Sequence, residues 1–374
     1  MYKMNYLIRS AITILSICFF SCQENTNKNI ISENIEIDIK QAQEKTLFTE
    51  YEYVKLETAD NCLLPPSINK IIYYKDTIII HSIENNNLSL FKENGKFIKR
   101  FSIGNGPNEI IYPVDIAFDN SSKNIWILDS YRFMKEFSLD GIQKKEIRVE
   151  DPYMKIGKLN NTLLLFDANL GKKNDYYFEF INNKNTTKHI KKKDYYKEIV
   201  YIPNSTFNII NDSTVYFYHQ FEDIIYSWKL GNQTVTPIYQ FDFKGQNSIA
   251  SIEFEKSLKP REYQKLYDNK EYIFGIKNLY TTNENLFFTI ETDKLYYCLY
   301  NKNNKKINIR TTLIEGLPNP RNIIGFDGNN LLYILTPEEL FTYSKNNKTS
   351  EKISKLIKDT KEDDNPIIIK CKIS

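Results

Sequence analysis

The sequence predicts an all-β fold, a six-bladed β-propeller built on a repeat of about 45 residues. An apolar strand, a polar turn and a second strand that ends near an aromatic residue recur six times along the chain. The aromatic anchors are Phe91, Phe137, Phe180, Trp228, Tyr300 and Tyr343. Because one small sheet cannot bury both of its faces, the six units need a ring in which neighbours share a core.

The spacing inside each unit predicts a hairpin. In the first two units, Phe91 and Phe137 stand four residues before Gly95 and Gly141. This is the distance expected between the end of a strand and a turn glycine. The same position holds Lys184, Asn232, Asn304 and Asn347 in the later units. Asparagine, like glycine, tolerates the left-handed backbone of such turns.

The ends of the repeat region predict how the ring closes. Residues 51–57 and 366–373 both have the composition of a strand. We expect them to pair in the last blade, since an unpaired edge invites aggregation. Residues 36–374 are then one propeller domain, and the charged segment 350–361 predicts a short surface helix.

One interval of the repeat is too long. Between Trp228 and Tyr300 the sequence contains a helical pattern that begins at Pro260, a residue suited to the first turn of a helix. We therefore predict a helical insertion at about 249–276, between blades four and five. It would either cover a pocket or pack beside the ring.

The N-terminus predicts export. Residues 1–21 contain a short apolar core after Lys3 and Arg9, and Cys22 follows a serine. This pattern predicts a lipoprotein-type signal peptide, lipidation of Cys22 and a flexible tether over 22–35. The phenylalanines before the serine depart from the lipoprotein pattern, so an ordinary signal peptide or an uncleaved anchor is the alternative. A net charge of +3 over 374 residues does not indicate nucleic acid as a partner.

The cysteines do not form a disulfide framework. Apart from Cys22, the mature chain contains Cys62, Cys298 and Cys371, an odd number. Cys298 and Cys371 lie in strand patterns and are expected to be buried thiols. No zinc-type spacing is present, so no metal ligands are assigned.

A candidate site follows from the blade connectivity. In a four-stranded blade, the turn between the second and third strands and the connection to the next blade lie on one face, which we name the loop face. The predicted binding residues on it are Glu109, Asp129, Arg132, His219 and Glu222. The acidic turns of this face predict a pocket for a cationic group or a hard metal ion held by oxygen ligands. The alternative is that they are ordinary solvated turns.

Residues 104–109, Gly-Asn-Gly-Pro-Asn-Glu, form one of these connections. They lack the Lys-Ser/Thr end of a phosphate loop and precede a strand rather than a helix. We expect a tight inter-blade turn in which Glu109 accepts backbone hydrogen bonds.

Catalytic motifs are absent from the sequence. The three histidines, His81, His189 and His219, have no metal-type spacing, and no nucleophile elbow is evident. No catalytic residue is therefore assigned, and the protein is expected to be a binding module rather than an enzyme. A carboxylate pair assembled in space would leave no local spacing, so a hydrolase or lyase stays open.

Four segments carry a resemblance to a known family. They are residues 53–58, 90–97, 104–109 and 364–369. With them the chain resembles the six-bladed β-propeller lipoproteins of Bacteroidota, which are distantly similar to NHL-repeat propellers. Asn108 stands where that family often has glycine. The resemblance implies a lipid-anchored cell-envelope protein and brings no reaction.

The expected function is therefore an envelope binding module that recognises a peptide, glycan or protein partner through the loop face. We expect a monomer attached to the outer membrane by its N-terminal lipid, facing the periplasm or the outside, without a cofactor. The alternative is a carboxylate-based hydrolase or lyase on an envelope glycan or peptide, with calcium as its supporting ion. A structural role in an outer-membrane complex is a third hypothesis.

Overall fold

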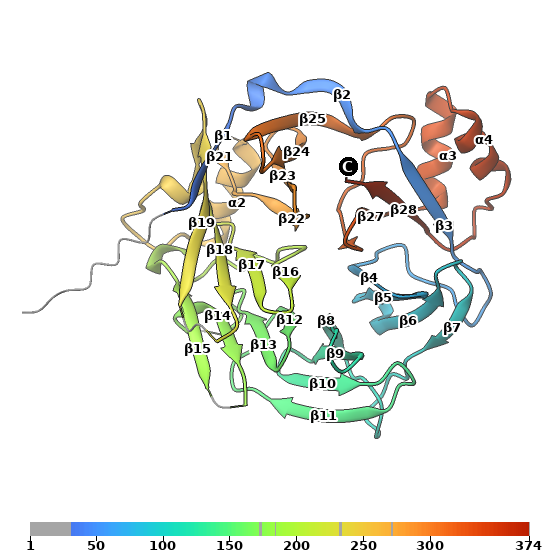
Figure 1. Cartoon of the computed structure of the whole chain (residues 1–374), viewed down its shortest axis with the longest axis horizontal. Helices are drawn as coiled ribbons and strands as arrows, with labels where there is room; N and C mark the ends of the chain where they lie inside the picture. The colour runs from blue at the N-terminus through green and yellow to red at the C-terminus, as the bar shows by residue number, and fades with distance from the viewer. Residues whose placement is uncertain (1–30, 172–173, 184, 232–233, 271, 374) are drawn as a thin grey trace, which may run out of the picture.

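The computed structural model describes residues 31–171, 174–183, 185–231, 234–270 and 272–373. The predicted signal peptide, Cys22 and most of the predicted tether lie outside the described residues. Six small sheets form a ring (Figure 1), and the predicted six-bladed β-propeller is confirmed. No helix among the described residues is both long and apolar enough to span a bilayer.

Blades one to three follow each other along the chain, each with its first strand nearest the axis (Figure 1). Blade one consists of β4 (Lys70–Tyr74), β5 (Thr77–Ser82), β6 (Asn87–Lys92) and β7 (Phe97–Arg100). Blade two consists of β8 (Pro113–Asp119), β9 (Asn124–Asp129), β10 (Phe133–Phe137) and β11 (Gln143–Arg148). Blade three consists of β12 (Lys155–Leu159), β13 (Thr162–Phe166), β14 (Tyr176–Ile181) and β15 (Thr186–Lys191). Neighbouring strands in each blade are antiparallel.

Blades four and five each gain a fifth strand from the N-terminus. Blade four consists of β16 (Phe207–Asn211), β17 (Thr214–Tyr218), β18 (Ile224–Lys229) and β19 (Val235–Phe243), with β1 (Glu33–Ile37) parallel to β19. Blade five consists of β22 (Lys277–Thr281), β23 (Asn285–Glu291), β24 (Leu295–Asn301) and β25 (Lys306–Ile314), with β2 (Gln43–Phe48) parallel to β25. The N-terminal segment thus runs around the outside of the ring and pairs both outer edges (Figure 1), which removes two exposed strand edges.

The last sheet combines both ends of the chain. It contains β26 (Gly325–Phe326), β27 (Asn330–Leu335), β28 (Ile367–Lys372) and β3 (Tyr51–Lys55). The C-terminal strand β28 is antiparallel to β3, with Ile367 opposite Lys55 and Cys371 opposite Tyr51. Cys371 and Cys298 are fully buried, as expected for structural thiols, and so is Cys62.

Two helical segments lie between strands of the ring. The segment between β19 and β22 contains η4 (Ile249–Ser251), α2 (Pro260–Asn269) and the short parallel pair β20 (Asn247–Ser248) and β21 (Tyr272–Ile273). Between β27 and β28 lie α3 (Pro337–Asn346) and α4 (Glu351–Lys358). Short 3-10 turns, η1 (Ile39–Gln41), η2 (Glu84–Asn86) and η3 (Asp194–Tyr196), complete the described elements.

The sixth aromatic anchor was wrong. Tyr343 lies on α3 rather than on a strand, and the third strand of this blade is β28. The local sequence explains the helix. Thr336 and Glu339 form a capping box, and Pro337 occupies the first helical position.

The other anchors lie where blades meet. The rings of Phe180 and Trp228 are 5.2 Å apart across blades three and four, and those of Phe101 and Phe137 are 5.8 Å apart across blades one and two. These aromatic contacts fill the wedge between neighbouring sheets, where large rings contribute most of the buried apolar area. The aromatic residues that repeat in the sequence therefore mark the interfaces between neighbouring blades.

Candidate functional site

Three of the predicted site residues lie together at blade two. Glu109 accepts a hydrogen bond from the backbone of Gly106 (2.6 Å), as the sequence predicted for this turn. Asp129 is fully buried and accepts hydrogen bonds from the backbone of Ile111 and Tyr112 (3.0 and 2.6 Å). The ammonium of Lys135 joins them, since it lies 2.7 Å from Asp129 Oδ2 and donates to the carbonyl of Glu109.

Arg132 is the exposed member of this group. Its backbone N–H donates to the carbonyl of Asp129 (3.3 Å), which places it on the turn between the second and third strands. The described residues offer no carboxylate within ion-pairing distance of its guanidinium. Of the three, Arg132 is the most exposed to solvent.

The other two predicted residues lie at blade four. His219 is buried, stacks on Tyr177 with ring centroids 3.6 Å apart, and accepts a hydrogen bond from the backbone N–H of Phe221. Burial and the nearby lysines Lys192 and Lys193 lower its pKa well below the usual range, so the imidazole is neutral. His219 therefore acts as a packed aromatic ring.

Glu222 lies beside His219 on the same turn and is partly exposed. It lies 3.9 Å from Lys193 and accepts from the hydroxyl of Tyr226. Burial raises its pKa, and burial also raises the pKa of the adjacent Asp223 to about 6. Across the described residues, no hydrogen bond or ion pair joins this group to the blade-two group, so the five residues form two clusters rather than one pocket.

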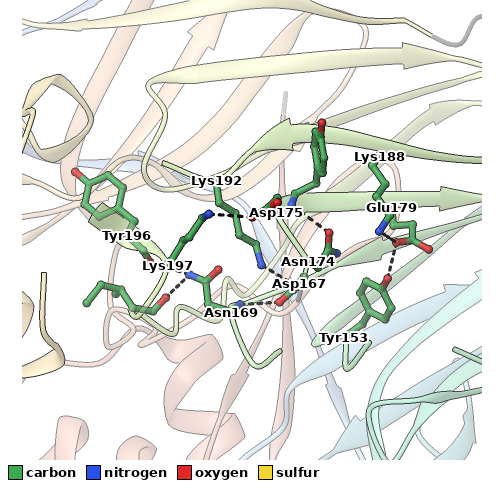
Figure 2. A network of polar contacts seen from close by, with 12 residues as sticks. Tyr153, Asp167, Asn169, Asn174, Asp175, Glu179, Lys188, Lys192, Tyr196 and Lys197 are labelled. Carbon is green, nitrogen blue, oxygen red and sulfur yellow. Dashed lines mark hydrogen bonds and ion pairs between the residues drawn. The ribbon is translucent and has the colours of Figure 1, made fainter. Parts of the chain in front are cut away.

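The acidic turn of blade three on the loop face is structural too. Figure 2 shows the network at blade three, where Asp167 and Lys192 form a buried ion pair (2.8 Å). Asn169 donates to the carbonyls of Tyr196 and Ile199 and holds the connection to blade four. Within the described chain, no group of three His, Cys, Asp or Glu side chains is arranged to hold a metal ion.

A cavity of about 690 Å³ lies on the axis of the ring. Its wall comes from the innermost strands of all six blades, β4, β8, β12, β16, β22 and β26. Since these strands run from the loop face to the opposite face, their first residues mark the loop-face end of the channel. Among them are Lys70, Asp115 and Lys155, with Asn204 and Ser205 just before β16.

Polar contacts hold the loop-face end of the channel together. The Lys70 ammonium lies 3.0 and 3.2 Å from the two oxygens of Asp115, and Asp115 Oδ2 accepts from the backbone N–H of Ile156 (2.9 Å). These contacts connect blades one, two and three. The amide of Asn204 donates to Asn278 (3.2 Å) and Asn322 (2.7 Å), which connects the entrance of blade four to blades five and six.

Lys155 lies in the same wall and differs from its neighbours. The residue is only 8% exposed, and the described residues provide neither a hydrogen-bond acceptor nor an ion-pair partner for its ammonium. Burial lowers its pKa, and the charge of nearby Asp115 opposes that shift. Most of the Lys155 side chain is therefore buried, but its ammonium is accessible from the channel and lies near a carboxylate that already pairs with Lys70.

The opposite end of the channel has paired charges. Lys158, near the end of β12, lies 3.3 Å from Asp119, and both side chains are nearly buried. Lys370 lies 3.4 Å from Asp327 in blade six. Each lysine there has its own carboxylate.

A second cavity, of about 850 Å³, lies against α3. Its wall comes from that helix and the two connections that enter blades one and six. Its exposed guanidinium, Arg321, is 3.5 Å from Glu339. Glu338 also lines this cavity and is exposed to solvent, so its charged groups lie at the surface rather than in a buried wall.

The sequence reasoning missed the channel residues. A usable signal was present, because charged residues at the starts of otherwise apolar inner strands are unusual at buried positions. Lys155 and Lys158 interrupt the short strand β12, and Asp115 and Asp119 do the same in β8. The sequence prediction placed the site in the turns because turn residues are usually accessible to a ligand.

Comparison with known proteins supports the fold. The family model described as "Domain of unknown function (DUF4934)" matches residues 29–372. A crystal structure from Bacteroides fragilis NCTC 9343, of a protein provisionally described as exported, is similar with a TM-score of 0.73 and 20% identity, over 91% of this chain and 99% of that chain. A DUF4221-family structure from Bacteroides vulgatus ATCC 8482 is similar with a TM-score of 0.51 and 10% identity, over 87% of this chain and 97% of that chain. No curated protein matches the sequence.

Proposed function

The chain belongs to the DUF4934 family, and we propose that it is a binding module of the bacterial cell envelope whose ligand enters the loop-face end of the central channel. The ligand is a glycan or a peptide segment. The observation that carries this proposal is the axial cavity of about 690 Å³, walled by the inner strands of six blades. Cavities of about 300–1,000 Å³ with a few convergent polar groups are typical of small-ligand sites.

The distribution of polar groups supports this location. At the predicted turns, the buried Asp129 and His219 already have partners, so they position the loops rather than contact a ligand. Glu109, Arg132 and Glu222 have more accessible side chains and remain candidates for outer contacts to a larger ligand or a partner protein. The channel wall adds a side chain that has no partner among the described residues, the ammonium of Lys155.

The envelope location rests on the N-terminal sequence and the solved relative. A short apolar segment ends at Cys22, and a structurally similar Bacteroides protein carries a provisional description as exported. We propose that Cys22 is lipidated and anchors a monomeric propeller to the outer membrane through a tether at 22–35. Cys22→Ala should abolish incorporation of labelled fatty acid, and unchanged labelling would rule out this anchor.

The binding proposal is tested by obstructing the channel. Ser205 lines the loop-face end, and Ser205→Trp would fill part of the space there. The matched control is Thr186→Trp on β15, the outermost strand of blade three, where the side chain is exposed. In a thermal-shift screen of envelope glycans and peptides, a ligand of the channel raises the melting temperature of the native protein.

We expect such a shift with the unmodified protein and with Thr186→Trp, and none with Ser205→Trp, provided that both variants fold by circular dichroism. A ligand that shifts all three proteins equally binds elsewhere and contradicts the proposal. A screen without any hit would leave the structural role in an envelope complex as the better hypothesis.

A second candidate function is supported by Glu222 and Asp223. Carboxyl groups with raised pKa values are typical of general acids, and both residues share one turn of the loop face. A hydrolase or lyase, with calcium as its supporting ion, would use them. Turnover of envelope polysaccharides that disappears in Asp223→Asn would favour this reading; equal turnover by both proteins would assign it to a contaminant.

A further inference from the structure

We propose that the loop-face end of the channel contains an anion subsite centred on Lys155, which binds the carboxylate of a small acidic ligand. The proposal rests on the function proposed above and specifies the chemistry of its ligand. The carboxylate could belong to an acidic sugar or to the C-terminus of a short peptide. Both have the same charged group, so the probes below are chosen to separate them.

The charges around Lys155 do not balance. Two ammonium groups, Lys70 and Lys155, lie near one carboxylate, Asp115. The neighbouring His81 is fully buried, its Nε2 donates to the carbonyl of Pro113 (2.8 Å), and its lowered pKa of about 4 keeps it neutral. The cluster therefore carries one uncompensated positive charge.

The carboxylate of Asp115 already has hydrogen-bond partners on both oxygens. Both of its oxygens contact Lys70, and one also accepts from the backbone of Ile156. Lys70 also donates to the carbonyl of Ile116 (2.6 Å). Lys70 is consequently fixed, and Lys155 is the cation that remains available.

Lys155 is accessible to a ligand in the channel. The Lys155 ammonium is not among the fully buried polar atoms that lack a partner, so it is accessible from the cavity. Lys155 is 92% buried, by complement of its 8% exposure, yet it lines a cavity large enough for a ligand. A carboxylate that enters from the loop face would supply the missing charge, and charge-assisted hydrogen bonds of this kind are about twice as strong as neutral ones.

The excess of one charge favours a carboxylate over a phosphate dianion. A monoanion leaves the cluster neutral, whereas a dianion would leave a negative charge in a wall that also contains Asp115. We therefore expect carboxylates to bind more tightly than inorganic phosphate. The remaining cavity would hold the uncharged part of the ligand.

The test compares charged and neutral probes on the purified full-length chain in detergent at low ionic strength. The probes are glucuronate against glucose, N-acetyl-dialanine against its C-terminal amide, and inorganic phosphate. Calorimetry or saturation-transfer NMR gives the affinities. We expect at least one carboxylate probe to bind tenfold more tightly than its neutral partner, and the pair that shows this difference identifies the source of the carboxylate.

The variants then locate the subsite. Lys155→Met should lose the preference for the carboxylate, while Lys155→Arg should keep it. The matched control is Lys158→Met, which changes a lysine of the same strand that is equally buried but paired with Asp119 at the far end, outside the proposed subsite. Carboxylate binding should be unchanged in Lys158→Met, and Lys155→Gln serves as a second neutral variant if Lys155→Met does not fold.

Three outcomes would overturn the subsite. These are equal affinity for charged and neutral probes, a preference that survives in both neutral variants of Lys155, or no binding of either carboxylate probe. The first outcome leaves the proposed binding function intact, because the neutral probes still bind. The Ser205→Trp comparison separately decides whether the channel binds anything.

Discussion

The two ends of the central channel use the same residue types in opposite ways. At the far end, Lys158 pairs with Asp119 and Lys370 with Asp327, one carboxylate for each ammonium. At the loop-face end, Lys70 pairs with Asp115, and the nearby ammonium of Lys155 makes no hydrogen bond or ion pair with a described residue. Lys155 and Lys158 are three residues apart on one strand and have the same exposed fraction, so burial does not distinguish them.

We interpret the paired lysines as groups that stabilise the fold and Lys155 as a group that is available to bind a ligand. A paired buried ion costs little net stability and fixes the geometry of neighbouring groups. A partly compensated ion costs stability, and proteins tolerate such costs mainly where function requires them. The comparison makes predictions about stability that need no knowledge of the ligand.

The largest effect is expected for Asp115→Asn. The substitution keeps the size of the side chain but removes the buried carboxylate near Lys70 and Lys155, so the half-buried Lys70 and the largely buried Lys155 both lose their counter-charge. We expect a loss of about 3–5 kcal/mol in the free energy of unfolding, as for other broken buried ion pairs. Urea denaturation measures it, and a loss below about 1 kcal/mol would show that the loop-face cluster is well solvated.

Lys158→Met should have an intermediate effect. It leaves Asp119 without its ammonium, but the hydroxyl and backbone N–H of Ser121 still donate to that carboxylate (2.6 and 2.8 Å). The lost pair and the lost contact of Lys158 with the face of Trp126 should cost roughly 2 kcal/mol. Asp119→Asn provides the reciprocal measurement, and the double variant should show that the two losses are not additive.

Lys155→Met should be close to neutral, within about 1 kcal/mol, because the ammonium that it removes makes no hydrogen bond or ion pair with a described residue and is accessible from the channel. Denaturation under the same conditions as Lys158→Met checks this. A loss as large as that of Lys158→Met would mean that both lysines serve the fold, and the contrast between the two ends would fail.

The sequence predicted the ring far better than the channel, because the repeat depends on residues close in sequence and the channel on residues far apart. The blade repeat consists of short spacings, such as the four residues from Phe91 to Gly95, and the strands around this spacing form a hairpin in the structure. The helix at Tyr343 was missed although its own signals were local, because the repeat period was given more weight than Pro337 and the capping box around Thr336.

Other features had no local signature. The pairing of β1 with β19 and of β2 with β25 joins residues far apart in the chain. Because these strands are parallel, no tight turn connects them, and the sequence contains no turn motif that would predict the pairing. The charge cluster likewise combines side chains from three blades, Lys70, Asp115 and Lys155. Which of two lysines in a strand finds a carboxylate depends on the angle between neighbouring blades, and a single sequence does not contain that information.

The smallest effect, and the one that sharpens the comparison most, is the dependence of stability on alkaline pH. Burial lowers the pKa of Lys155, so the unfolded chain binds more protons than the folded chain between that lowered pKa and the ordinary value of about 10.5. Stability in this window should therefore rise with pH in the unmodified protein relative to Lys155→Met. Parallel denaturation series at pH 8 to 10 measure the difference and cancel the contribution of the tyrosines.

A carboxylate ligand should change this slope at one end of the channel alone. Lys158 also has a lowered pKa because of burial, and Asp119 already opposes that shift. A bound carboxylate would raise the pKa of Lys155 towards its ordinary value and reduce the pH-dependent difference between the unmodified protein and Lys155→Met. The corresponding difference for Lys158→Met should stay the same with and without ligand. If the ligand changed both differences equally, it would act on the whole fold, and Lys155 would have no special place in binding.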